Sequence, residues 1–191
     1  MKGLLIVISA PSGTGKSTVV RRLLARMPRL IHSVSCTTRA PRTGETDGVD
    51  YHFVTEKEFE HRIQRGYFLE WAKVHDASYG TPRRPIDDAI ARGMGILLDI
   101  DVQGGMAIKQ AFPDALTIFL LPPSLTILEE RLKDRATDNR ETMRVRLENA
   151  KGEMAYQNRY DDRVVNDDLD RAVESIERLI TSRLGSQGST P

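Results

Sequence analysis

The stretch LLIVISAPSGTGKST, residues 4–18, decides the fold. Its first five residues are a short apolar run, typical of a buried parallel strand. Residues 10–17 resemble the phosphate-loop pattern G-x-x-x-x-G-K-[ST], with alanine at the first position, and a helix is predicted to start at Lys16. Glycines let backbone amides close around a phosphate, and a helix N-terminus adds partial positive charge. We therefore predict that a nucleoside triphosphate is bound by Ala10, Pro11, Ser12, Gly13, Thr14, Gly15, Lys16, Ser17 and Thr18.

Two side chains of this loop have predicted roles. Lys16 is expected to reach the β and γ phosphates and to be catalytic, and the Ser17 hydroxyl is expected to bind Mg²⁺, the predicted cofactor. The alternative is a glycine-rich turn that binds nothing, which the preceding strand and the subsequent helix disfavour. The loop alone leaves GTPase, ATPase, small-molecule kinase and nucleotide kinase open.

Further apolar runs and helical patterns alternate along the chain. Val164-Val165 is a candidate short strand, and Ser124 can cap a helix. The longer predicted strands are Leu4–Ile8, Ile96–Ile100 and Leu116–Leu121, and the longer predicted helices are Lys16–Met27 and Arg171–Leu184. Strands that alternate with helices predict an α/β fold of three layers, in which helices cover both faces of a parallel core sheet.

Composition excludes several classes of protein. Of the 191 residues, 39% are hydrophobic and 29% are charged, which is typical of a globular domain. The net charge of +1 predicts no nucleic-acid partner, and no apolar run approaches the roughly 20 residues of a membrane span, so no membrane partner is expected. The single cysteine, Cys36, excludes an intramolecular disulfide and is compatible with a cytoplasmic protein.

Several runs spread along the chain carry a family resemblance. The most specific is Thr37-Thr38-Arg39-Ala40-Pro41-Arg42 with Asp50-Tyr51 further on, and others are Phe68–Trp71, Tyr79–Thr81, Leu98–Gly104 and Val165–Leu169. Together with the phosphate loop, they identify the chain as similar to the guanylate kinase family from Ile6 to about Leu169. The resemblance implies a P-loop kinase that moves the γ-phosphoryl group of ATP onto GMP, with dGMP expected as a further acceptor.

The resemblance implies a site for the GMP phosphate. Pro41 favours an extended Ala40, so that Arg39 and Arg42 can converge on one anion, for which guanidinium groups are suited. Arg39 is also expected to be catalytic. Tyr51 and Tyr79 are implied as hydroxyl donors to the same phosphate.

The resemblance also implies a site for the guanine base. Glu70 and Asp101 would accept hydrogen bonds from N1 and N2, and Ser35 and Thr81 would face O6. Asp99 and Asp101 end an apolar run and are expected on one side of a strand. Asp99 is a further GMP-binding candidate, but which of the two aspartates serves the base, the ribose or the Mg²⁺ water shell stays open.

The ATP side of the site rests on resemblance as well. Arg135 and Arg146 are implied as catalytic, with Arg135 also binding ATP and Arg131 as a further candidate. Ala136 replaces the glycine usual after this arginine in the family. Asn166 and Asp167 match the stretch that lies near the adenine.

These assignments divide the single predicted domain into parts. The core is predicted at about 1–32, 82–128 and 164–184, the GMP-binding insertion at about 33–81 and the lid at about 129–163. Residues 185–191 are expected to form a flexible tail. There are two alternative functions. One is a domain without catalysis that binds phosphopeptides in the GMP site, which the intact phosphate loop disfavours. The other is a kinase for AMP or TMP, which Glu70 and the loop with Arg39 and Arg42 disfavour. The oligomeric state is not readable.

Overall fold

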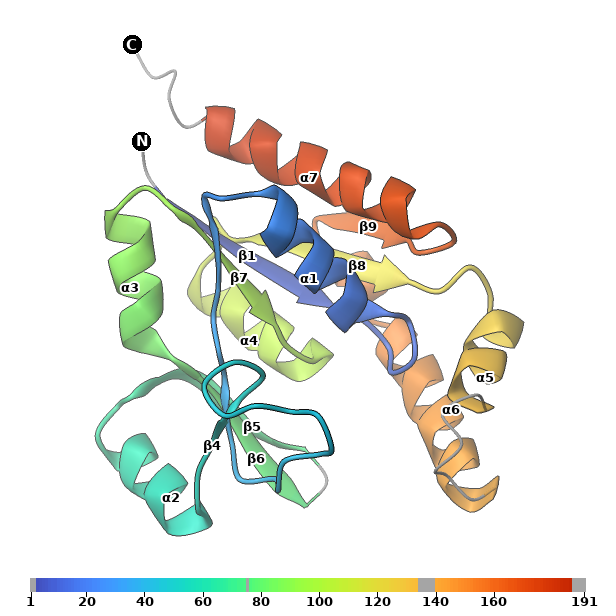
Figure 1. Ribbon diagram of the computed structural model, residues 1–191, viewed down its shortest axis with the longest axis horizontal. Helices are drawn as coiled ribbons and strands as arrows, with labels where there is room; N and C mark the ends of the chain where they lie inside the picture. Colours follow the sequence, from blue (N-terminus) through green and yellow to red (C-terminus); the bar gives the residue numbers. More distant parts are fainter. Residues whose placement is uncertain (1–2, 75, 134–139, 187–191) are drawn as a thin grey trace.

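The computed structural model describes residues 3–74, 76–133 and 140–186. Its centre is a five-stranded parallel sheet with the order β2-β7-β1-β8-β9 (Figure 1). The strands are β1 (Leu4–Ser9), β2 (Leu30–His32), β7 (Gly95–Asp99), β8 (Leu116–Leu121) and β9 (Asp162–Val165). The predicted parallel core sheet is therefore confirmed.

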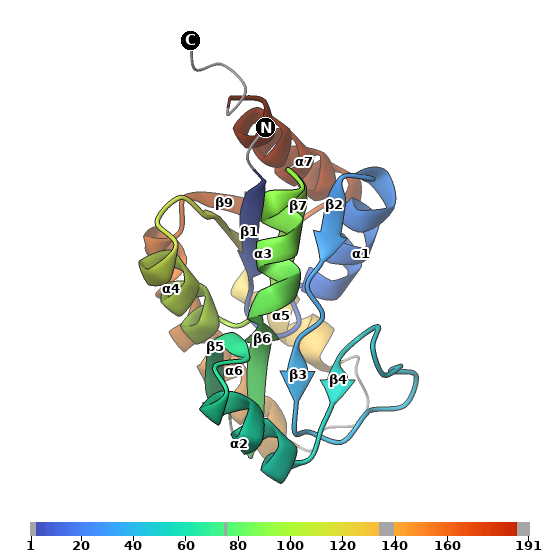
Figure 2. The same cartoon turned by 90° about the vertical axis from the view of Figure 1, so that its left-hand side faces the viewer.

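The alternation of side chains along β1 explains why both faces of this sheet are covered. Leu4, Ile6 and Ile8 pack with residues of α1 and α7, whereas Leu5 and Val7 pack with residues of α3 and α4. Figures 1 and 2 show these helices on opposite sides of the sheet. Their bounds are Lys16–Arg26 for α1, Arg83–Ala91 for α3, Val102–Ala111 for α4 and Leu169–Ser186 for α7. The three predicted layers are present.

A second, four-stranded sheet with the order β4-β3-β6-β5 lies beyond the ends of the central strands (Figure 2). Its small core is formed by Cys36, Phe59 and Phe68, and α2 supplies Phe59. Thr55 caps α2, because its Oγ1 accepts a hydrogen bond from Glu58 N at 3.2 Å. The bounds are Cys36–Thr37 for β3, His52–Phe53 for β4, Glu56–Gln64 for α2, Phe68–Val74 for β5 and Ala77–Pro82 for β6.

A helical pair lies beside the end of β8 (Figure 1). The helices are α5 (Leu125–Lys133) and α6 (Arg140–Met154), joined through a small cluster of Leu128, Leu132 and Ala150. A short turn of 3-10 helix, η1 (Gln157–Arg159), leads from α6 to β9. Among the described residues, none of the helices has both the length and the apolar character that a membrane crossing requires.

The predicted elements match the observed ones where the sequence pattern is long. The predicted strand Leu116–Leu121 is observed with the same bounds, and α7 continues through Gly185 and Ser186, past the predicted helix end. Residues 187–191, which complete the predicted tail, lie outside the described residues.

Candidate functional site

The strand order creates a crevice at the carboxyl ends of β1 and β7. These two strands are neighbours, with Ile8 opposite Asp99. The chain leaves β1 toward β2 on one side, and it leaves β7 toward β8 on the other side of β1. A parallel sheet binds ligands where successive connections diverge in this way. The predicted phosphate loop and the predicted aspartates meet at this point.

The phosphate loop has the backbone that its sequence requires. Gly13 and Gly15 have φ angles of 88° and 93°, which other residues rarely adopt, and Gly15 is the N-cap of α1. The side chain of Ala10, the departure from the motif, is 7% exposed and belongs to the core between the sheet and α1. The alanine is therefore accommodated by packing.

Two residues, from α5 and from the end of β9, hold the phosphate loop. Asn166 Nδ2 donates a hydrogen bond to Thr14 O at 2.7 Å, and the Arg131 guanidinium donates to the same oxygen at 3.2 Å and to Asn166 O at 3.3 Å. Arg131 is a predicted candidate for contact with the transferring phosphoryl group. In this structure it links α5, the end of β9 and the phosphate loop.

Lys16 extends from α1 across the crevice to the end of β7. Its Nζ lies 2.5 Å from Asp99 Oδ1 and donates a hydrogen bond to Ile100 O at 2.9 Å. Both side chains of the ion pair are about one-fifth exposed, at 20% and 19%. The pairing of β1 with β7 thus brings the predicted catalytic lysine to the predicted GMP-binding aspartate.

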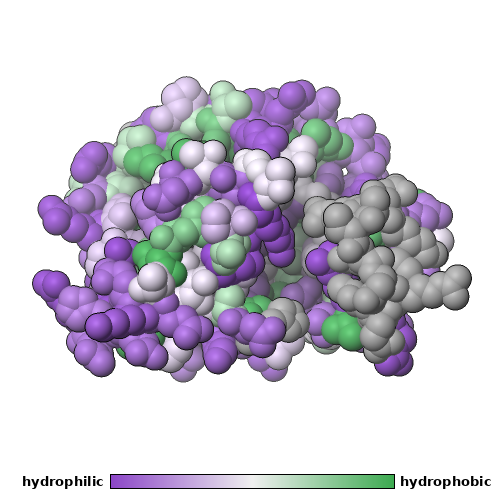
Figure 3. Space-filling model, turned by 60° about the horizontal axis from the view of Figure 1, so that its bottom comes forward, coloured by the Kyte–Doolittle hydropathy of each residue, from purple (hydrophilic) through white to green (hydrophobic). Residues whose placement is uncertain are grey.

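A polar cavity of about 320 Å³ opens beside this ion pair. Figure 3 shows hydrophilic side chains around a hollow on one face of the molecule. Tyr51 and Tyr79 meet edge to face in the cavity wall, with ring centroids 6.0 Å apart. Burial, with a contribution from Asp99, raises the pKa of Tyr51 to about 12, so its hydroxyl is a donor at neutral pH. The predicted site residues that line this cavity are Ser17, Ser35, Arg39, Arg42, Tyr51, Tyr79 and Asp99.

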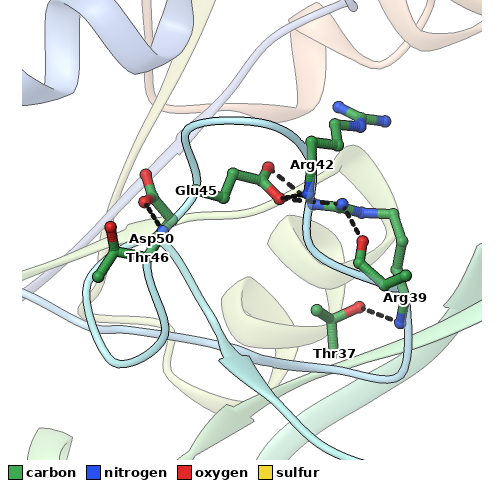
Figure 4. A network of polar contacts seen from close by, with 7 residues as sticks. Thr37, Arg39, Arg42, Glu45, Thr46 and Asp50 are labelled. Carbon is green, nitrogen blue, oxygen red and sulfur yellow. Dashed lines mark hydrogen bonds and ion pairs between the residues drawn. The ribbon is translucent and has the colours of Figure 1, made fainter.

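The Arg39 guanidinium is held by a neighbouring carboxylate (Figure 4). Its two terminal nitrogens donate to Glu45 at 3.0 Å and 2.9 Å, and its carbon lies 5.5 Å from the centre of the Tyr51 ring. These hydrogen bonds hold the pKa of the Glu45 carboxyl below its usual value. The Arg42 side chain extends away from Glu45 in Figure 4. The sequence pattern predicts no role for Glu45, since an acidic residue on a polar loop carries no periodic signal.

A smaller cavity of about 170 Å³ adjoins the first and shares Ser35, Tyr51, Tyr79 and Asp99 with it. Its walls include Glu70, and Glu70 Oε1 accepts a hydrogen bond from Thr81 Oγ1 at 2.5 Å. Burial raises the pKa of Glu70, although the hydrogen bond from Thr81 opposes the shift. Lys16 lies between the two cavities, because it lines the smaller one and pairs with Asp99, which lines both.

Asp101 reaches this smaller cavity in a way that the sequence pattern does not predict. The strand β7 ends at Asp99, and Asp101 is the N-cap of α4, where its Oδ1 accepts a hydrogen bond from Gly104 N at 2.8 Å. Asp99 and Asp101 therefore line one cavity from two different elements.

The predicted lid residues Arg135 and Arg146 are not among the described residues that line the two cavities. Arg135 and Ala136 lie outside the described residues. Arg146 lies on α6, and of the described residues that line the two cavities none comes from α5 or α6. Asp167 lies on the outside at the start of α7, where its carboxylate accepts hydrogen bonds from Asp168 N and from the Arg171 guanidinium.

Comparisons with known proteins agree with this arrangement. The family described as guanylate kinase matches residues 2–183. The chain is 49% identical over 181 residues to guanylate kinase of Myxococcus xanthus, covering 94% of this chain and 87% of that protein. It is 44% identical over 181 residues to guanylate kinase of Carboxydothermus hydrogenoformans, and the match covers 95% of this chain and 89% of that protein.

Solved structures show the same relationship. The crystal structure of guanylate kinase from Anaplasma phagocytophilum is 33% identical, with a TM-score of 0.80 over 96% of this chain and 87% of that one. Shikimate kinase from Bacteroides thetaiotaomicron, at 11% identity and a TM-score of 0.51, shares the fold alone. The chain belongs to the guanylate kinase family.

Proposed function

We propose that this protein transfers the γ-phosphoryl group of ATP to GMP, and also to dGMP, giving ADP and GDP or dGDP. The observation that carries the proposal is the junction of the two cavities at Lys16 and Asp99. A phosphate loop lies on one side of this junction, and a carboxylate-lined cavity of a size suited to a base lies on the other. The family membership supports the same reaction.

The smaller cavity supports guanine as the base. Guanine presents proton donors at N1 and N2 and an acceptor at O6, so its edge matches the Glu70 carboxylate and the Ser35 hydroxyl, which both line this cavity. Thr81, the other hydroxyl predicted to face O6, lines neither cavity and instead donates its hydrogen to Glu70. Adenine presents an acceptor at N1, so no N1–H group of the base would donate to Glu70, whose hydrogen bond from Thr81 engages only Oε1. Sites with such buried polar groups reject the wrong ligand by factors of about 10⁴.

The larger cavity supports a monophosphate as the acceptor. Arg39, Arg42 and the hydroxyls of Tyr51 and Tyr79 provide donors around one anion. The phosphate of GMP is ionised at neutral pH, so no general base is required. Phosphoryl transfer depends mainly on alignment and on positive charge near the transferring group, for which we propose Lys16 and Arg39, together with Arg135 and Arg146.

The residues present fit a Mg²⁺ ion that arrives with ATP. Ser17 and Asp99 line the larger cavity, and hydroxyl and carboxylate oxygens are ligands that Mg²⁺ accepts. Within the described ranges, no cluster of three or more His, Cys, Asp or Glu side chains could hold a metal alone, so phosphates and water must complete its shell. When bound, the ion would neutralise charge that develops between the β and γ phosphates.

We further propose that two parts of the protein move during the reaction. The insertion (33–81) and the lid (129–163) would close on the core, because an open site would let water take the γ-phosphoryl group. Asn166 and Asp167 would lie near the adenine. We also propose a cytoplasmic location.

A coupled assay of ADP release tests the function. We expect turnover with GMP and dGMP, and rates with AMP, CMP and TMP lower by roughly 10³ or more. Omission of Mg²⁺ should abolish turnover. Equal rates with AMP and GMP would refute guanine recognition, and no ADP release with any monophosphate would refute the kinase.

A further inference from the structure

We propose that Glu45 is a positioning residue that holds the Arg39 side chain and the Arg42 main chain in place at the larger cavity for the phosphate of GMP. The proposal rests on the proposed function, because it assigns the larger cavity to a monophosphate. Glu45 lies in the loop between β3 and β4 and lines that cavity.

The first support is the geometry of the Arg39–Glu45 pair. Arg39 Nη1 donates to Glu45 Oε2 at 3.0 Å and Arg39 Nη2 donates to Oε1 at 2.9 Å, so both ends of each group are engaged. The side chains are only 18% and 19% exposed. A two-point contact between planar groups fixes orientation as well as distance.

The second support is that the same carboxylate fixes the backbone at Arg42. Glu45 Oε2 accepts a hydrogen bond from Arg42 N at 2.7 Å, and Glu45 N donates to Arg42 O at 3.0 Å. The turn that closes between them contains Gly44, whose φ of 88° is unfavourable for other residues. One side chain therefore links the side chain of Arg39 to the main chain of Arg42 (Figure 4).

The third support is that the contact leaves donors on Arg39. A guanidinium has five N–H donors. The pair with Glu45 uses two, and Ala40 O accepts a third from Nη1 at 2.6 Å. That leaves two of the five donors unused by these contacts, on a side chain that lines the larger cavity together with Tyr79. Arg39 can thus bind a phosphate without releasing Glu45.

A different role for Glu45 predicts the opposite result. If the carboxylate only occupied the place of the phosphate, removing its charge would strengthen GMP binding. The hydrogen bond from Arg42 N disfavours this role. A carboxylate that only competed with the phosphate for Arg39 would not need to fix the turn at Arg42.

The test is binding of GMP and of guanosine, without ATP, by titration calorimetry. In Glu45→Gln the amide keeps the shape but opposes the guanidinium with its own N–H groups. We expect GMP binding to weaken roughly tenfold or more, as for loss of a charge-assisted hydrogen bond, and guanosine binding to stay unchanged. The Glu45→Asp variant keeps the charge on a shorter side chain, so its affinity for GMP should lie between the affinities of the parent and of Glu45→Gln.

A matched control uses another carboxylate paired with arginine. Glu58 accepts from Arg62 Nε at 2.7 Å on α2, away from both cavities, and Glu58→Gln should leave both affinities unchanged. In an Arg39→Lys background, the effect of Glu45→Gln on GMP should shrink, because the two residues act together.

The outcomes separate this proposal from the proposed function. If the parent protein binds no GMP, the proposed function fails and this proposal fails with it. If the parent binds GMP but Glu45→Gln binds it equally well or more tightly, only the role of Glu45 is overturned. Equal weakening of GMP and guanosine would also overturn it, because it would indicate a general loss of structure.

Discussion

Thr81 donates its hydroxyl hydrogen to Glu70 Oε1 at 2.5 Å, across the antiparallel pairing of β5 and β6, in which these residues are partners. Thr81 is fully buried. The helix α4 approaches from the other side, where a Cβ added to Gly104 would lie 3.1 Å from Glu70 Oε2. The Glu70 carboxylate is therefore fixed at the wall of the smaller cavity by neighbours on both sides.

Replacement of Glu70 by alanine should damage the use of GMP selectively. We expect the KM for GMP to rise by about one to two orders of magnitude, as for loss of a charged hydrogen-bond partner, with the KM for ATP unchanged. Steady-state kinetics with each substrate varied in turn measure both constants. An unchanged KM for GMP would remove Glu70 from the base site.

The stability of the protein should depend on pH through Glu70. Burial raises the pKa of Glu70 above its ordinary value, so between the two values the native state binds more protons than the unfolded state. This contribution lowers the free energy of unfolding as pH rises through that window. The Glu70→Gln variant has no titrating group at this position, so it lacks this pH dependence. The melting temperature of this variant relative to the parent should therefore increase as pH rises above the ordinary glutamate pKa of about 4.3.

Asp161 provides a control of opposite sign. Burial alone would raise its pKa, but the hydrogen bonds from Lys109 and Thr117 lower it overall. Asp161→Asn should accordingly lose stability relative to the parent as pH rises toward the ordinary aspartate pKa, because the charged form is the stabilised one. A flat pH dependence for both variants would contradict these assignments.

Replacement of Lys16 by alanine should abolish turnover while the fold persists. Loss of one preorganised positive group at the transferring phosphate costs about 10² to 10³ in kcat or more. The Asp99 carboxylate would lose its ion partner, so the free energy of unfolding should also fall by about 1 kcal/mol.

The double variant Lys16→Ala/Asp99→Ala separates these two effects. It should recover part of the lost stability but none of the activity, because it removes the unpaired carboxylate without restoring the cation. Arg22→Ala is a suitable control on α1, since Arg22 pairs with Asp170 at an exposed position. Urea unfolding and the ADP-release assay report the two properties independently. Full activity in Lys16→Ala would contradict the assignment of the loop.

Gly105 on α4 should not tolerate a methyl group. A Cβ there would lie 2.3 Å from Tyr160 Oη and 2.9 Å from Ser9 Oγ, and all three residues are buried. We expect Gly105→Ala to lower the free energy of unfolding by about 2 kcal/mol through overpacking. Tyr160→Phe removes the clashing atom, so the loss caused by Gly105→Ala should be smaller in that background.

Gly152 is the matched control for this prediction. It also lies in a helix, α6, but an added Cβ would meet nothing within 4 Å. Gly152→Ala should stabilise by roughly 0.5–1 kcal/mol, as expected from helix propensity. Similar effects of both alanine variants in urea unfolding would show that the clash at Gly105 is not decisive.

The sequence by itself determined the phosphate loop and much of the core. The loop needs a buried strand, glycines and a helix start within residues 4–18, so all of its determinants are near neighbours. The same holds for β8, a continuous apolar run, and for the cap of α5, where Ser124 Oγ accepts from Ile127 N at 3.1 Å. Such local patterns are read from residue order because the interactions they encode are local.

Only the tertiary structure decided which distant groups meet. The short strand β2 and the helices α3 and α4 are not predicted by the sequence pattern, and Asp101 caps α4 instead of ending a strand. The Lys16–Asp99 pair depends on β1 lying beside β7, and the Thr14 contacts depend on α5 and β9 reaching the loop. Glu45 is placed by the turn from Arg42 to Glu45, which has no repeating pattern of apolar and polar residues that would predict its position. These contacts come from strand order and packing between elements, and no local run of residues encodes them.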